Sequence, residues 1–414
     1  MTKKYGCIGE VLKHSFSREI HAALGEYEYR LIELKRDELG SFAEKGDFTG
    51  INVTIPYKEL IIPYLYEIDA HAAAIGAVNT VVNREGRLYG YNTDFYGMSK
   101  LIEHAGVTVG GKKVAILGTG GTSKTALAVV SALGAREVVR VSRDGKEGAI
   151  TYDELYSKHQ DTEVIINTTP VGMYPNISSS PVSLDFFPAL SGVIDAVYNP
   201  LRTELILSAR ERGIPCEGGL YMLVAQGVRA SEIFLDTSYP DGTLECVYRK
   251  LLSEKENIAL IGMPASGKST VGAIIADKLG RDVLDSDTEI VKKCCKQIPD
   301  IFKESGEAHF RELESDVIAS LSAMTSLIIA TGGGAVLKKE NVRNLKKNSR
   351  IYFIDRPLTS LIPTEDRPLS STREAIESRY RERYGIYLGS ADVRIDADAD
   401  AESVAEMIIG DFRK

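Results

Sequence analysis

Cysteine is scarce in this sequence. The 414 residues include five cysteines, most of them far apart, with no CxxC pair and no Cys/His spacing typical of a zinc site. An odd number of scattered thiols is not the pattern of a disulfide framework. We therefore expect the protein to reside in a reducing compartment, the cytoplasm. The cysteines are Cys7, Cys216, Cys246, Cys294 and Cys295.

Long apolar runs are also missing. No segment approaches the roughly 18 consecutive apolar residues that a bilayer-spanning helix needs. The first residues, MTKKYGCIGEVLKHS, lack the apolar core of a signal peptide. We expect no association with a membrane.

The sequence has no excess of basic residues. Lysine and arginine number 50 against 58 aspartates and glutamates, which gives a formal net charge of −8. Because nucleic-acid phosphates are recognised by basic surfaces, this balance disfavours DNA and RNA as partners. Hydrophobic residues (43%) and charged residues (26%) are near the average for globular proteins, so the chain should fold throughout. At this length we expect two or three domains.

Apolar runs of strand length alternate with helix-length segments along the chain. Strands are predicted at 112–118, 136–142, 163–167 and 193–197, joined by segments long enough for crossover helices. Consecutive buried strands joined in this way form a parallel sheet. The order of strand, turn and helix begins again at residue 257. The sequence therefore predicts an α/β protein with more than one such unit.

A first glycine loop, Gly-Thr-Gly-Gly-Thr-Ser at 118–123, stands between a predicted strand and a predicted helix. At such a junction, helix-start N–H groups meet the pyrophosphate of a dinucleotide. The motif alone is weak because other strand-to-helix turns also need glycine, but the strand that follows favours a dinucleotide. The residues predicted to bind it are Gly118, Gly120, Gly121, Thr122 and Ser123.

The end of the next strand should select the coenzyme. An acidic residue there binds the ribose 2′-hydroxyl of NAD, whereas arginine accommodates the 2′-phosphate of NADP. This sequence has both, in the order Ser142, Arg143, Asp144. Ser142 and Arg143 are predicted to bind NADP, while Asp144 leaves NAD or dual use open.

A second glycine loop is more specific. Residues 262–269 match GxxxxGK[ST] in full, after a strand and before a helix. Its N–H groups and lysine should bind the β and γ phosphates of ATP, and its serine should bind magnesium. The predicted ATP-binding residues are Gly262, Ser266, Gly267, Lys268, Ser269 and Thr270.

Two carboxylates follow in LDSDTE. Asp285 and Asp287 are two residues apart, so on an extended segment both face the same side. One can serve magnesium and the other an acceptor hydroxyl, although an acidic helix cap would have the same pattern. We assign the metal to Ser269 and Asp285.

Residues 5–250 resemble shikimate dehydrogenase. The resemblance is carried by ordered motifs: HSFS (14–17), GINVTIPYKE (50–59), GAVNT (76–80), GYNTD (90–94), NTTPVGM (167–173), DAVYNP (195–200) and GGLYMLVAQG (218–227). It implies a cleft between a substrate domain and a Rossmann domain. It also implies that Lys58 and Asp94 form the catalytic pair. The implied ligands of 3-dehydroshikimate are Ser15, Ser17, Thr54, Asn79, Tyr198 and Gln226.

Residues 257–414 resemble shikimate kinase. The motifs are HFRELE (309–314), DRPL (366–369) and RERYGIY (381–387), together with the second glycine loop. The resemblance implies that Asp285 assists magnesium, that Asp287 orients or deprotonates the 3-hydroxyl, and that a lid arginine reaches the phosphates. The implied residues are Arg311, Gly333, Gly334 and Arg383 for the substrate and Arg367 for the lid. Gly385 stands where the family usually has proline, and the lid is short.

These observations predict three domains. Residues 1–106, completed by 218–250, form the substrate-binding domain; residues 107–217 form a Rossmann NADP-binding domain; residues 257–414 form a P-loop domain like nucleoside-monophosphate kinases. The predicted function is reduction of 3-dehydroshikimate with NADPH, followed by 3-phosphorylation of shikimate with ATP and Mg²⁺.

Two alternatives remain open: a dehydrogenase that also accepts quinate, and a C-terminal module that binds nucleotide without turnover. We expect small-molecule substrates and a monomer or homodimer.

Overall fold

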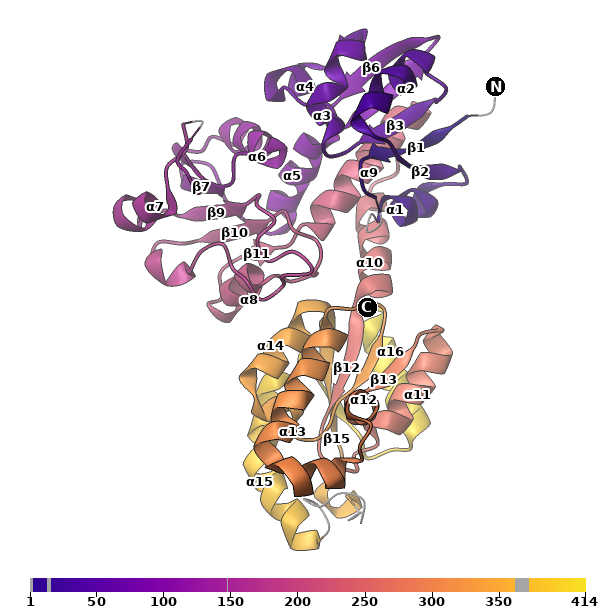
Figure 1. Cartoon of the computed structure of the whole chain (residues 1–414), viewed down its shortest axis with the longest axis vertical. Helices are drawn as coiled ribbons and strands as arrows, with labels where there is room; N and C mark the ends of the chain where they lie inside the picture. Colours follow the sequence, from indigo (N-terminus) through magenta and orange to yellow (C-terminus); the bar gives the residue numbers. More distant parts are fainter. Residues whose placement is uncertain (1–2, 13–15, 147, 362–371) are drawn as a thin grey trace. The chain divides into compact units, whose positions relative to one another are not determined.

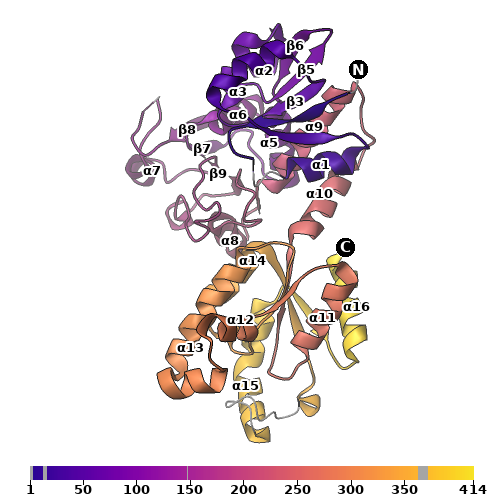
Figure 2. The same ribbon diagram turned by 45° about the vertical axis from the view of Figure 1, so that its right-hand side comes forward.

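The computed structural model describes residues 3–12, 16–146, 148–361 and 372–414. The chain divides after Leu251 into two compact units (Figures 1 and 2). In the described part of the chain, no helix combines the length and apolarity needed to cross a lipid bilayer. All five cysteines have free thiols.

The first sheet lies in residues 5–91 and has the spatial order β2-β1-β3-β5-β6-β4. Its inner strands pair in parallel around β1, and a hairpin of β5 and β6 adds antiparallel pairs. A core that includes Ile8, Ile51 and Val81 packs on this sheet. The strands are β1 (Tyr5–Gly9), β2 (Tyr29–Glu33), β3 (Gly50–Val53), β4 (Glu67–Ile68), β5 (Thr80–Arg84) and β6 (Arg87–Tyr91), and the helices are α1 (Ser17–Leu24), α2 (Leu39–Lys45), α3 (Tyr57–Leu60) and α4 (Ala70–Ile75).

Two long helices, α5 (Thr93–His104) and α9 (Leu220–Leu235), pack against each other beside this sheet (Figure 1). Their backbones approach closely at Gly97, where an added Cβ would lie 2.8 Å from the Met222 carbonyl oxygen. Helix α9 also contacts α1, β3 and β5. Although α9 follows the second sheet in sequence, it therefore packs with the first.

The second sheet has five strands, all parallel, in the order β11-β10-β9-β7-β8. The parallel sheet expected from the alternating pattern is confirmed. Its core joins strand residues such as Ala115 and Ile165 to helix residues such as Leu155 and Leu205. The strands are β7 (Lys113–Leu117), β8 (Glu137–Val141), β9 (Val164–Asn167), β10 (Gly192–Asp195) and β11 (Cys216–Glu217), and the helices are α6 (Gly121–Ala132), α7 (Tyr152–Lys158) and α8 (Glu204–Glu211); α10 (Thr243–Lys255) follows α9.

The second unit contains a parallel sheet in the order β13-β14-β12-β15-β16. Alternate residues of β12 enter different cores: Ile258 and Leu260 pack with α11 and α16, while Ala259 and Ile261 pack with α13, α14 and α15. Both faces are thus covered by helices, which confirms the α/β class. The elements are β12 (Asn257–Ile261), α11 (Lys268–Leu279), β13 (Val283–Asp285), α12 (Ser286–Cys294), α13 (Ile298–Ser322), β14 (Ile328–Ala330), α14 (Lys339–Asn348), β15 (Ser349–Asp355), α15 (Arg373–Ser390), β16 (Val393–Asp396) and α16 (Ala401–Phe412).

Candidate active sites

A cavity of about 160 Å³ lies between the two sheets of the first unit. Its wall is built from β1, β3, α3, α5 and α9, and from the loops that follow β7 and β10. The structure brings together in this wall most of the substrate and catalytic residues proposed from sequence. These are Ser17, Thr54, Lys58, Asn79, Asp94, Tyr198 and Gln226, joined by Thr122 at the start of α6.

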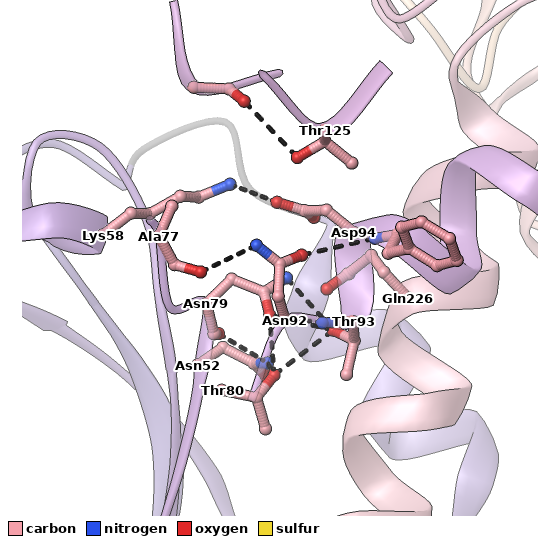
Figure 3. Close-up of polar contacts among 12 residues, drawn as sticks. Asn52, Lys58, Ala77, Asn79, Thr80, Asn92, Thr93, Asp94, Thr125 and Gln226 are labelled. Carbon is pink, nitrogen blue, oxygen red and sulfur yellow. Dashed lines mark hydrogen bonds and ion pairs between the residues drawn. The ribbon is translucent and has the colours of Figure 1, made fainter. Parts of the chain in front are cut away.

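The Lys58 ammonium and the Asp94 carboxylate face each other in this cavity, with Nζ 2.6 Å from Oδ2 (Figure 3). Lys58 lies on α3, which is anchored by the fully buried ring of Tyr57. Asp94 lies in the first turn of α5, which Asn92 caps by accepting the Phe95 N–H. The Lys58 and Asp94 side chains are 22% and 12% exposed, so the pair is shielded but borders the cavity. It can donate a proton where negative charge develops on a substrate oxygen.

Asn79 is held in place through the residue next to Asp94. Its Nδ2 donates to Thr93 Oγ1 (3.0 Å), and its Oδ1 accepts the Thr93 backbone N–H (2.7 Å; Figure 3). The Asn92 side chain donates to the Ala77 carbonyl (2.8 Å), which ties the start of α5 to the same segment. Because an amide NH₂ carries two hydrogens, Asn79 keeps the capacity to donate to a ligand in the cavity.

Asn52 lines the cavity as well, and the sequence did not single it out. Its Oδ1 accepts the Tyr29 hydroxyl (2.6 Å) and lies 3.2 Å from Nε2 of His21, while its Nδ2 donates to Thr80 Oγ1 (3.2 Å). Burial lowers the pKa of His21 to about 3, so this imidazole is neutral. The only sequence signal was the position of Asn52 in GINVT, two residues before the proposed ligand Thr54.

Other proposed substrate residues lie on α1, on α9 and in the loop after β10. Ser17 begins α1, Gln226 lies on α9 with its Nε2 donating to a carbonyl of the preceding turn (2.8 Å), and both line the cavity. The ring of Tyr198 packs on Phe16, with ring centroids 5.3 Å apart. Ser15 lies outside the described residues.

The first glycine turn joins β7 to α6. Gly118 has a φ of +110°, and an added Cβ there would lie 2.8 Å from Thr168 Oγ1. At Gly120 and Gly121, an added Cβ would meet no described atom within 4 Å, so the space outside the start of α6 is open. The turn therefore fits a pyrophosphate beside the helix-start N–H groups. Ser123 lies beneath the turn: it is fully buried and donates its backbone N–H to the Gly120 carbonyl (2.9 Å).

The three polar residues after β8 differ in their surroundings. Asp144 accepts the Ser142 hydroxyl (3.1 Å) and pairs with Lys146 (2.9 Å). The hydrogen bond from Lys146 lowers the pKa of Asp144. Arg143 is exposed. With the carboxylate charge balanced by Lys146 and the guanidinium at the surface, this corner fits the 2′-phosphate of NADP.

The second glycine loop follows β12 in the second unit. Gly262 and Gly267 have φ of +150° and +91°, and an added Cβ at Gly262 would lie 2.8 Å from the Ile354 carbonyl oxygen. The Lys268 side chain is folded over the loop, with Nζ donating to the carbonyls of Gly262 (3.0 Å) and Met263 (2.8 Å). Lys268 is 7% exposed, so its charge is concentrated at the loop, as phosphate binding requires.

Oxygen ligands for a metal stand beside this loop. The Ser269 hydroxyl donates to Asp285 Oδ2 (2.7 Å), and Asp285 Oδ1 accepts the backbone N–H of Asp287 (2.9 Å). A hydroxyl and a carboxylate are the hard donors that Mg²⁺ prefers. Among the described residues, no group of three or more His, Cys, Asp or Glu side chains could hold a metal ion. The donors at Ser269 and Asp285 thus fit a magnesium ion that takes its other ligands from nucleotide and water.

An arginine pocket lies near Asp287. Arg311 pairs with Glu314 (2.7 Å) and Glu307 (3.1 Å), and its guanidinium lies against the backbone of Gly334, where an added Cβ would be 2.2 Å from Nη1. Glu314 is 1% exposed, and burial raises the pKa of its carboxyl. Glu314 was not singled out from sequence, although its spacing of three residues from Arg311 on one helix was a signal.

Arg383 reaches the same glycine segment from α15. Its Nη1 donates to the Gly333 carbonyl (3.3 Å), which also accepts the Tyr387 hydroxyl. Arg383 is 7% exposed, and among the described residues its buried Nε has no hydrogen-bond partner. An unpaired buried guanidinium N–H fits an anionic ligand. Arg367 lies outside the described residues.

Comparison with known proteins assigns each unit. A family model described as "Shikimate dehydrogenase substrate binding domain" matches residues 7–81, and one described as "Shikimate kinase" matches residues 264–412. Over 267 residues the chain is 38% identical to the shikimate dehydrogenase (NADP(+)) of Clostridium perfringens, covering 60% of this chain and 98% of that relative. The chain belongs to the shikimate dehydrogenase family. The shikimate kinase match continues the assignment into the second unit.

Solved structures agree with this family assignment. Shikimate dehydrogenase 1 from Peptoclostridium difficile is 38% identical with a TM-score of 0.55, covering 60% of this chain and 97% of that one. A chorismate mutase/shikimate 5-dehydrogenase fusion protein from Clostridium acetobutylicum is 33% identical with a TM-score of 0.57, over 61% and 97%. The resemblances to both families, the α/β class, and the use of NADP and ATP expected from sequence are confirmed.

Proposed function

We propose that this chain catalyses two consecutive reactions, the NADPH-dependent reduction of 3-dehydroshikimate to shikimate and the ATP-dependent phosphorylation of shikimate at its 3-hydroxyl. The observation that carries the proposal is that one chain has both the Lys58–Asp94 pair in a dehydrogenase cavity and a complete phosphate loop beside an arginine pocket. The product of the first site is the substrate of the second. The site residues named for both reactions are part of the proposal.

In the reduction, the bound NADPH supplies a hydride to the carbonyl carbon of 3-dehydroshikimate. The electron pair of the C=O bond moves to the oxygen, which takes a proton from the Lys58 ammonium. Asp94, 2.6 Å from Nζ, orients the ammonium and stabilises its charge before transfer. Lys58 is reprotonated from solvent, and Ser17, Thr54, Asn79 and Gln226 hold the carboxylate and hydroxyls of the substrate.

In the phosphorylation, bound Mg²⁺ and ATP supply the phosphoryl group and offset its charge. Lys268 leaves the carbonyls of its own loop to bind the β and γ phosphates, and Ser269 and Asp285 hold the metal. Asp287 would accept the proton of the 3-hydroxyl as the hydroxyl oxygen bonds to the γ-phosphorus, while the bond from that phosphorus to the bridging oxygen breaks and ADP leaves. Arg311 and Arg383 bind the carboxylate of shikimate, because a guanidinium matches a carboxylate in shape and charge.

The three-domain division, a cytoplasmic location, a monomeric or homodimeric state, and the absence of nucleic-acid and membrane partners belong to the same proposal. Free thiols at all five cysteines support a reducing location. The packing of α9 on α1, β3 and β5 supports a substrate domain completed by residues 218–250.

A C-terminal module that only binds nucleotide is the weaker candidate. A sensor needs the phosphate loop but has no use for a substrate carboxylate pocket or for Asp287. The buried guanidinium of Arg383, whose Nε lacks a partner among the described residues, favours a kinase that binds an anionic substrate.

The test is a single reaction mixture of purified protein, 3-dehydroshikimate, NADPH and MgATP. NADPH loss is followed at 340 nm, ADP release by a coupled assay, and the product by mass spectrometry. We expect both cofactors to be consumed and shikimate 3-phosphate to form. A rate of ADP release that does not depend on added shikimate would refute the kinase assignment. Failure to oxidise NADPH would refute the dehydrogenase assignment. Replacing shikimate by quinate in the reverse, NADP⁺-reducing direction tests the wider substrate range.

A further inference from the structure

A buried carboxylate that the proposed reduction does not use lies at the end of the second sheet where the carboxyl ends of its strands meet. Asp195 ends β10, directly opposite Asn167 at the end of β9, and its side chain is fully buried. Carboxyl ends of parallel strands in such sheets border the ligand site. Asp195 therefore lies at the end of the sheet that borders the proposed ligand sites, and it is not among the residues that line the cavity.

Three donors converge on this side chain, one from β9 and two from the segment between β10 and α8. Oδ1 accepts Asn167 Nδ2 (2.9 Å) and the Val197 backbone N–H (3.0 Å), and Oδ2 accepts the Thr203 hydroxyl (2.6 Å). Burial raises the pKa of Asp195 to about 6, so at neutral pH the group is ionised and acts only as an acceptor. A carboxylate can satisfy all three donors at once, whereas an apolar residue would leave each of them unpaired.

Asn167 begins the segment that supports the coenzyme turn. The next residue, Thr168, donates its hydroxyl to the Leu117 carbonyl (2.6 Å) and lies where a Cβ on Gly118 would come within 2.8 Å. The position of residues 167–169 therefore sets the backbone path of the turn from β7 into α6.

Val197 lies in a segment that forms part of the wall of the substrate cavity. It stands between Ala196 and Tyr198, which both line that cavity. Its carbonyl accepts the backbone N–H of Gly219 (2.9 Å), another lining residue. Thr203 completes the segment as the N-cap of α8, accepting the Ile206 N–H (3.4 Å).

We propose that Asp195 is a positioning residue for the reduction: by holding Asn167 and Val197 on one oxygen, it fixes the coenzyme turn relative to the wall of the substrate cavity. The inference rests on the proposed dehydrogenase activity. Hydride transfer needs the two reacting carbons in close alignment, and a misplacement of about 1 Å can cost roughly 10²-fold in rate. Asp195 acts through its partners and touches neither ligand.

Thr203 offers a matched set of variants. Thr203→Val removes the donor to Asp195 and the cap of α8, while Thr203→Ser keeps both. Thr162→Val is the control, because Thr162 is also fully buried and its hydroxyl donates to a carbonyl at 2.7 Å, but it lies between α7 and β9, away from both ligand loops. Asp195→Ala removes all three bonds at once.

The measurements are kcat and KM for NADPH and 3-dehydroshikimate. We expect Thr203→Val to raise both KM values by about threefold to tenfold, the size of one hydrogen bond of ordinary net strength. Asp195→Ala should lower kcat/KM by about 10²-fold. Thr203→Ser and Thr162→Val should keep the wild-type KM values.

If the role of this cluster were only structural, Thr203→Val would yield less folded protein, and its apparent kcat would fall while both KM values stayed unchanged. That result would overturn the inference. An equal rise of the KM values in Thr162→Val would overturn it as well. If Asp195→Ala does not fold, the threonine series still decides. If the wild type does not reduce 3-dehydroshikimate, the proposed function fails separately. NADP⁺ affinity by equilibrium dialysis then decides the inference, which requires weaker binding in Thr203→Val than in Thr162→Val.

Discussion

The two glycine loops of this chain perform related tasks with different groups. The loop at 118–123 offers backbone N–H groups at the start of α6, next to open space at Gly120 and Gly121. The loop at 262–269 adds the buried ammonium of Lys268 and the Ser269–Asp285 pair. The first only has to hold the phosphates of a coenzyme, whereas the second has to stabilise charge that moves during phosphoryl transfer. A helix N-terminus suffices for binding, and transfer needs a lysine and a metal.

The two substrate pockets also differ in the number of charged side chains, with more of them in the second unit. Around Lys58 and Asp94, the dehydrogenase cavity is lined mainly by hydroxyl and amide side chains, and we propose that this ion pair lies at the reacting oxygen. The kinase pocket has two arginines, one of which pairs with the buried carboxylate of Glu314. We infer that a site whose reaction develops one negative charge, on the substrate oxygen, tolerates a nearly uncharged lining, whereas a site next to a triphosphate must hold the substrate carboxylate with strong cations.

Removing Lys58 should have the largest effect. Lys58→Ala deletes the proton donor for the developing alkoxide, and we expect reduction to fall by about 10²–10⁴-fold. Phosphorylation of added shikimate should be unchanged. Steady-state assays of both reactions test this, with Lys100→Ala as control, because Lys100 pairs with Glu103 at 2.8 Å on the outside of α5. Loss of both activities in Lys58→Ala would contradict separate sites.

The converse substitution is Lys268→Ala. It removes the cation that we propose to stabilise the charge of the phosphoryl group during transfer. We therefore expect the kinase kcat to fall by about 10²–10³-fold, with the rate of reduction unchanged. Lys278→Ala is a suitable control, since Lys278 lies on the same helix and pairs with Glu402 and Glu406. An unchanged kinase rate in Lys268→Ala would show that the second loop, like the first, acts without a lysine side chain, contrary to our inference.

Arg143 should distinguish the coenzymes. Arg143→Ala removes the cation proposed for the 2′-phosphate, and we expect the KM for NADPH to rise about tenfold, the size of one charge-assisted contact. The KM for NADH should change little. Arg136→Ala, an exposed arginine that pairs with Glu163 in the same domain, is the control. Equal changes for both coenzymes would place Arg143 outside the 2′-phosphate site.

His21 predicts a smaller effect, on stability rather than rate. Its pKa is about 3 when folded and 6.5 in its ordinary state, so between these values the unfolded chain binds more protons. The stabilisation is complete above pH 6.5 and is lost as the pH falls towards 3. Between pH 6 and 5, unfolding of residues 1–251 should become easier by up to about 1.4 kcal/mol per pH unit relative to His21→Gln.

Hydrogen exchange with mass spectrometry measures this stability separately for peptides of each unit. His71→Gln is the control, because His71 is exposed and should leave the pH slope of the wild type unchanged. A slope in His21→Gln equal to that of the wild type would exclude His21 as its source.

The local features of the fold were predictable from sequence. The strands predicted at 112–118, 136–142, 163–167 and 193–197 are β7, β8, β9 and β10. The pattern did not show that the glycines after β14 lie against Arg311 and Arg383. Period and glycine position report local backbone geometry, and they do not report which distant side chains a turn will meet.

The site residues divide in the same way. Gly118, Gly262 and Lys268 could be proposed from sequence because a phosphate loop is a local structure, with its spacing set by the backbone of a single strand-to-helix turn. Asn52, Glu314 and Asp195 were not, since each acquires its role from partners on other elements or from burial.

The sequence by itself determined the position of the two glycine loops that join a strand to a helix and that we propose to bind phosphate. Such turns depend on neighbouring residues and on the positive φ that glycine allows. Only the tertiary structure decided that Lys58 meets Asp94 at 2.6 Å, that a neutral His21 supports Asn52, and that Asp195 receives three donors. Contacts between residues far apart in the chain depend on how whole elements pack, and burial then sets the charge of the groups enclosed between them.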